Sequence, residues 1–167
     1  MKKNIYGWLI TLFCLVSSLA LLSQNSVPAL QGLHDQYILI KNALVSGNPA
    51  EAAKQAAIFA DMAVAKDVKK LTETEQKALN GSKPLLVAEA RSIAGSKDIT
   101  KQRDVFISFS DGFIQLAKSA QVSKDKIYID YCPMKKAYWL SEGAQVKNPF
   151  YGNQMLTCGK LTETLYQ

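Results

Sequence analysis

Apolar residues recur at helical spacing from residue 30 to residue 121, and this pattern restricts the fold more than any other feature of the chain. The first stripe has members at i, i+4, i+7 and i+11: Leu33, Tyr37, Ile40 and Leu44. Such spacing places all four side chains on one face of a helix. Ser46-Gly47 then provides a helix stop.

The next two helices have recognisable starts. Asn48 is suited to cap a helix whose first residue is Pro49, where the missing N–H of proline costs nothing. Thr72 and Glu75 have the spacing of a capping box and predict the start of a third helix. Pro84, shortly after Asn80-Gly81, predicts a kink or break within that third helix.

A fourth helix is predicted over residues 99–121. Phe106, Phe109 and Phe113 share one face of it and are interpreted as core residues. Four amphipathic helices joined by short loops predict an all-α fold, an antiparallel four-helix bundle over residues 30–121.

Beyond Ser123 the chain changes character. Residues 126–131 alternate as a short strand does, and residues 132–159 are dense in proline, glycine, aromatic residues and sulfur, without helical periodicity. Side chains such as Trp139 and Phe150 are costly to leave in water. We therefore expect residues 122–167 to form an irregular tail that packs on the bundle within the same domain.

Residues 1–29 have the layout of a secretory signal peptide. Lys2 and Lys3 precede 18 uncharged residues, and small residues allow cleavage after Ala20 or Ala29. The alternative is an uncleaved anchor helix, which would be the chain's only attachment to a membrane. We expect an exported, periplasmic protein, whose formal charge falls from +6 to +4 when both lysines are removed. This excess is too small and dispersed for a nucleic-acid surface.

The tail carries a set of motifs: IYIDYCPM, WLS and VKNPFYGNQMLTCG. It resembles the carboxyl-terminal signature of a family of exported bacterial helical-bundle proteins of unknown function. Some members are joined to the periplasmic adaptor subunits of heavy-metal efflux systems. The resemblance extends to YILIKNALV (37–45) and KQRDVF (101–106), and it implies a metal-linked, copper-related periplasmic role and an efflux adaptor or other periplasmic protein as partner. Histidines that members often carry near the third and fourth helices are replaced here by Arg91, Lys101 and Val105.

Sulfur is the chemistry that this tail offers. Two short clusters each pair one cysteine with one methionine: Cys132 with Met134, and Met155 with Cys158. Thiolate and thioether are soft ligands that suit Cu(I), so these four residues are the predicted metal site. The alternatives are a Cys132–Cys158 disulfide with core methionines, in a structural or interaction bundle, and free buried thiols.

Other chemistry is poorly supported by the sequence. It contains no G-x-S-x-G, P-loop, G-x-G-x-x-G or C-x-x-C-H motif, so we do not expect an enzyme. His34 is the single histidine and is interpreted as an exposed or hydrogen-bonded helix residue. Beyond Cu(I), no cofactor is expected.

Overall fold

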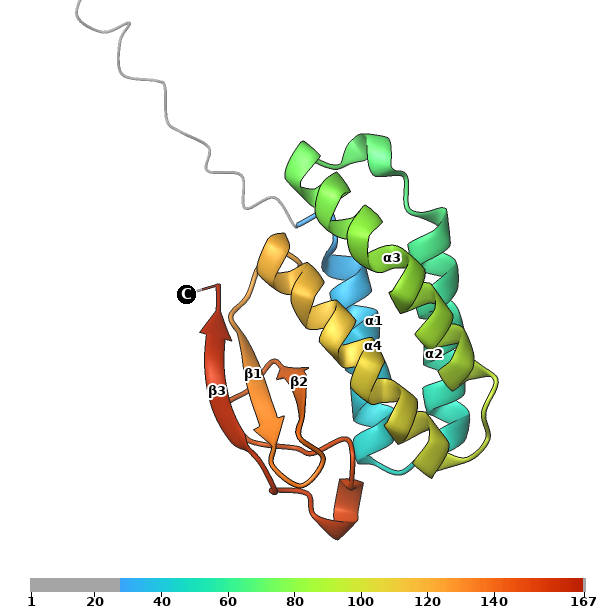
Figure 1. Ribbon diagram of the computed structural model, residues 1–167, viewed down its shortest axis with the longest axis vertical. Coiled ribbons are helices and arrows are strands. Elements are labelled where there is room, and N and C mark those ends of the chain that lie inside the picture. Colours follow the sequence, from blue (N-terminus) through green and yellow to red (C-terminus); the bar gives the residue numbers. More distant parts are fainter. Residues whose placement is uncertain (1–27, 167) are drawn as a thin grey trace, which may run out of the picture.

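Four helices precede three strands in the computed structural model, which describes residues 28–166 (Figure 1). The helices are α1 (Gln31–Val45), α2 (Pro49–Ala65), α3 (Glu73–Ala94) and α4 (Ile99–Ser119). The strands are β1 (Ile127–Cys132), β2 (Ala137–Ser141) and β3 (Lys160–Leu165). Short 3-10 turns lie at Val68–Lys70 and Gly152–Gln154. The predicted helical bundle is therefore present.

The predicted helix starts are confirmed. Asn48 accepts a hydrogen bond from the Glu51 N–H at the start of α2, and Thr72 and Glu75 form a reciprocal capping box at the start of α3. Asp98 caps α4 in the same way. These side chains satisfy backbone N–H groups that have no partner within the helix.

A kink or break was predicted within the third helix, and of these the break does not occur, because α3 continues through Pro84. Proline removes one backbone hydrogen bond, and the carbonyl it leaves free belongs to Asn80. Both residues are exposed, so water can satisfy that carbonyl. Solvent exposure of this face explains how the helix tolerates its proline.

Aromatic rings fill the centre of the bundle. The Tyr37 ring stacks on Phe113 with centroids 4.7 Å apart, and Phe59 meets Phe109 edge-on at 4.9 Å. All four residues are completely buried, as predicted for the phenylalanines of the fourth helix. Such pairs contribute roughly 0.5–1.5 kcal/mol beyond the burial of their area.

The all-α expectation was partly wrong, because the tail forms a three-stranded antiparallel sheet in the order β2-β1-β3. The strand predicted over residues 126–131 is confirmed as β1. The other two strands were not predicted. β3 is largely exposed and shows no clear apolar alternation, and it exists only because it pairs with β1, about thirty residues earlier.

The sheet packs against α4, on the side of the bundle away from α2 and α3 (Figure 1). Trp139 of β2 is fully buried and meets Phe150 edge-on at 5.8 Å. Phe150 in turn lies 6.1 Å from the Phe106 ring of α4. The tail thus shares the core of the bundle.

Residues 1–27 lie outside the described part of the chain, and most of the predicted signal peptide falls there. Among the described helices, none combines the length and apolar character required to cross a membrane.

Candidate functional site

The two cysteines of the tail lie at the same end of the sheet. Cys132 is the last residue of β1, and Cys158 stands two residues before β3 begins. Because Tyr131 pairs with Lys160 in the antiparallel ladder, Cys158 reaches the end of β1 where Cys132 lies. Residues 26 positions apart in sequence are therefore brought together by strand pairing.

Both cysteines are free in the described residues, and no disulfide joins them. Cys132 is completely buried, whereas Cys158 is half-buried. Desolvation raises the pKa of the Cys158 thiol, and the charge and hydrogen bonding of Cys132 raise it further. A thiolate at Cys158 is therefore disfavoured unless a bound cation compensates its charge.

The two methionines lie on the loops that flank this thiol pair. Met134 is in the turn between β1 and β2, and Met155 follows the 3-10 turn Gly152–Gln154. Their side chains are 64% and 38% exposed, so the alternative that treated them as core residues was wrong. The structure brings both cysteines to one end of the sheet but leaves both thioethers at the surface.

Asn148 organises the loop that delivers Cys158, and sequence reasoning missed it. Its side chain donates to the Cys158 carbonyl at 2.6 Å and accepts from the Phe150 N–H at 2.8 Å. Its backbone N–H donates to the Leu156 carbonyl at 2.8 Å. Asn148 is completely buried. The signal was the Asn148-Pro149 pair, since asparagine before proline favours this type of turn.

A cation lies beside the thiol pair. The Lys135 ammonium is 2.8 Å from Asp104 Oδ1 and 5.9 Å from the centre of the Tyr151 ring. The hydrogen bond to Asp104 raises the pKa of Lys135, and the Cys132 thiol adds a smaller electrostatic contribution.

His34 is not part of this thiol pair. It lies on α1, is completely buried, and comes close to the tail at Glu142, just after β2. Ser141 pairs with Tyr128 and Ala137 pairs with Cys132, so His34 and the cysteines are at opposite ends of the β1–β2 hairpin.

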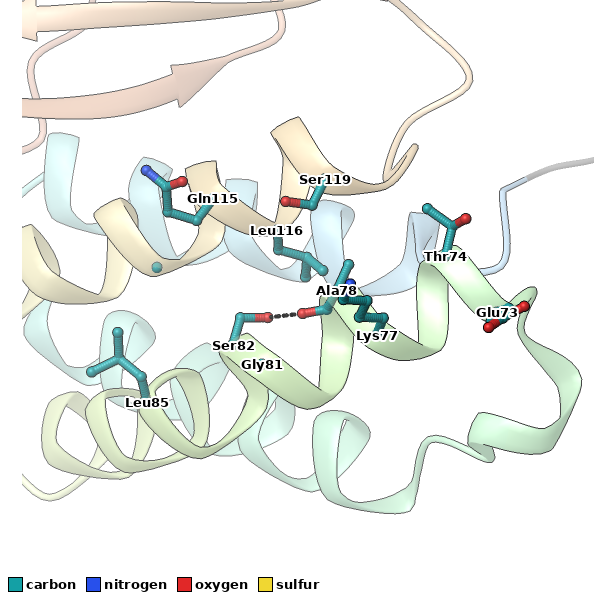
Figure 2. Close-up of a pocket in the computed structure, with 11 residues that line it drawn as sticks. Glu73, Thr74, Lys77, Ala78, Gly81, Ser82, Leu85, Gln115, Leu116 and Ser119 are labelled. Atoms are coloured by element: carbon teal, nitrogen blue, oxygen red, sulfur yellow. Dashed lines mark hydrogen bonds between the residues drawn. The ribbon is translucent and has the colours of Figure 1, made fainter.

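A groove of about 660 Å³ lies between α3 and α4 (Figure 2). Small residues leave it open: Ala78, Gly81, Ser82 and Gly112. The Ser82 hydroxyl is occupied by a hydrogen bond to the Ala78 carbonyl at 3.0 Å. The groove is lined by no cysteine or histidine, and it contains none of the predicted metal ligands.

Together, the fold and the site define a four-helix bundle with an appended antiparallel sheet that carries a cysteine pair. Residues 33–125 match the DUF3347 family of proteins of unknown function. Because this match covers more than half of the chain, the protein belongs to that family. The matched range ends before β1, so the thiol pair lies outside it. No curated protein and no solved structure matches the chain.

Proposed function

We propose that this protein is an exported, non-enzymatic module that binds a soft monovalent ion, Cu(I), in association with heavy-metal efflux. Its ligands would be Cys132 and Cys158, assisted by Met134 and Met155. The observation that carries the proposal is that strand pairing places two free cysteines, which the sequence separates by 25 residues, at the same end of the sheet. Two adjacent thiolates provide the soft, anionic ligand pair that Cu(I) prefers.

The surroundings of the thiol pair support a binding role. Asn148 ties the Cys158 carbonyl into a closed loop, which holds one ligand relative to the other before an ion arrives. A preorganised pair loses less conformational freedom on binding than a flexible one.

The methionines support the choice of ion. Met134 is 64% exposed on a turn two residues after Cys132, where its thioether contributes little to the core. A flexible, exposed thioether beside a thiol suits capture of Cu(I), because thioether is a weak ligand for zinc.

The exported location and the link to efflux rest on the amino-terminal sequence and on the resemblance of the tail. The partner would be a heavy-metal efflux adaptor or another periplasmic protein. In that compartment the same cysteines can oxidise, so the alternative is a structural bundle whose tail is fixed by a Cys132–Cys158 disulfide.

The test is an anaerobic titration in which the reduced protein competes for Cu(I) with a chromogenic chelator. We expect the wild type to bind one equivalent, and the Cys132→Ser/Cys158→Ser double variant to lose tight binding. Met134→Leu and Met155→Leu should weaken binding while conserving volume. Met62→Leu is the matched control, because Met62 has a similar exposure to Met155 but lies on α2.

Equal loss of copper from the wild type and the double cysteine variant would refute the metal site. Thiol titration of protein purified without reductant then distinguishes the alternative. A disulfide leaves no free thiol in the mature chain, whereas the reduced state leaves two.

A further inference from the structure

His34, Asp35 and Glu142 bring three potential metal ligands together where α1 meets the end of β2. One ligand atom from each residue lies within 4.8 Å of the other two. Within this group, His34 Nδ1 is 3.6 Å from Asp35 Oδ1. Small rotations of the exposed Asp35 and Glu142 side chains would bring both carboxylates within the span of one coordinated ion.

The imidazole itself gives an independent indication of a ligand. His34 is completely buried, yet its Nε2 has no hydrogen-bond partner among residues 28–166. Its Nδ1 lies 3.4 Å from the Gln31 side-chain amide nitrogen. Buried polar atoms are nearly always paired, so the unpaired Nε2 of a buried imidazole whose Nδ1 lies 3.6 Å from Asp35 requires an explanation.

The electrostatic environment suits a cation. Glu142, Asp35 and Asp125 all act on His34 with negative charge, and these carboxylates come from three different parts of the chain. Burial has the opposite and larger effect, and it lowers the pKa of His34. The neutral ring is the form that binds metal ions.

We propose that His34, Asp35 and Glu142 form a binding site for a divalent transition-metal cation, with Zn²⁺ as the probe. One imidazole nitrogen and two carboxylate oxygens leave a fourth position for water. The side chain of Asp35 is 59% exposed and Glu142 is also exposed, which provides access from solvent.

This site is separate from the thiol pair and independent of the proposed function. Glu142 follows Ser141, which pairs with Tyr128, whereas Cys132 pairs with Ala137 at the other end of the hairpin. Its nitrogen and oxygen ligands are harder than sulfur and select a divalent ion over Cu(I).

The experiment uses the Cys132→Ser/Cys158→Ser chain, so that Zn²⁺ cannot bind the thiols. A chromogenic zinc indicator competes with the protein at pH 7.5. We expect one equivalent to bind, and Glu142→Gln to weaken binding at least about tenfold, as loss of a ligand does. Asp125→Asn is the matched control. It removes a nearby carboxylate that is not among the three ligands and should change the affinity less than about threefold.

Proton NMR provides the second readout, because His34 is the only histidine and its ring signals need no further assignment. At a Zn²⁺ concentration that half-saturates the control, the shift of these signals should be clearly smaller in Glu142→Gln. The proposal is overturned if the Cys132→Ser/Cys158→Ser chain binds no zinc, if both carboxylate variants weaken binding equally, or if zinc binds without shifting the ring signals. None of these outcomes depends on copper binding at the cysteines.

Discussion

The hydroxyl groups of Tyr37 and Ser110 lie 2.7 Å apart in the buried interface between the bundle and the sheet. Tyr37 also accepts the Leu140 N–H at 3.0 Å, and Ser110 donates to the Tyr138 carbonyl at 2.9 Å. One residue from α1 and one from α4 thereby satisfy backbone groups of β2. This pair joins the two parts of the fold.

Tyr37→Phe should destabilise the protein by about 1–3 kcal/mol, because the Leu140 N–H would be buried without a partner. Chemical denaturation followed by Trp139 fluorescence measures this change. Tyr128→Phe is the control, since Tyr128 is only half-buried. If both variants unfold at the same denaturant concentration, the hydrogen bonds to the sheet contribute nothing to stability.

Gly152→Ala should weaken docking of the tail. Gly152 has a φ of +54°, and an added Cβ would lie 2.7 Å from the Val45 carbonyl oxygen at the end of α1. That oxygen belongs to the backbone and cannot move easily, so we expect a loss of about 1–3 kcal/mol, as in overpacked cores. Thermal unfolding provides the measurement. Gly143→Ala, which meets no atom within 4 Å, should leave the melting temperature nearly unchanged.

Stability should fall as the pH decreases from about 7 to 5. Burial lowers the pKa of His34 below its ordinary value of 6.5, although Glu142, Asp35 and Asp125 oppose this shift. The unfolded chain therefore takes up a proton at a higher pH than the folded chain, and stability is lost as the pH falls below 6.5.

His34→Gln should reduce the stability that the protein loses between about pH 7 and pH 5, and unfolding measured across this range tests it. Burial raises the pKa of Asp111 and Asp130 above the ordinary value of 3.8, so their protonation on acidification favours the folded state and opposes the effect of His34. Both aspartates remain in the variant. The difference between the two profiles therefore reports His34 alone. Superimposable profiles would mean that His34 does not titrate differently in the two states.

If the amino-terminal segment is cleaved, we expect the cut after Ala20 rather than Ala29. Leu30 is completely buried, and the Ala29 carbonyl accepts a hydrogen bond from the Lys66 ammonium. Cleavage after Ala29 would place a charged amino group on a buried residue, which is unfavourable. Intact mass measurement of the exported protein decides this. A mass that begins at Leu30 would contradict the expectation, and one that retains Cys14 would indicate an anchor.

The four helices and their starts could be predicted from the sequence. The apolar stripe from Leu33 to Leu44, the Asn48 cap and the Thr72–Glu75 capping box all depend on residues within a few positions of each other. Local interactions of this kind leave a periodic signal, which single-sequence reasoning can detect. β1 was predictable for the same reason.

The sheet and the arrangement of the candidate sites were decided by tertiary structure. β3 forms because it pairs with β1, and that pairing also brings Cys158 to Cys132. The meeting of His34 and Glu142, 108 positions apart, depends on how β2 packs beside α1. The residue types that carry sulfur chemistry were visible in the sequence. Which of them meet was not, because long-range packing leaves no periodic trace in a single chain.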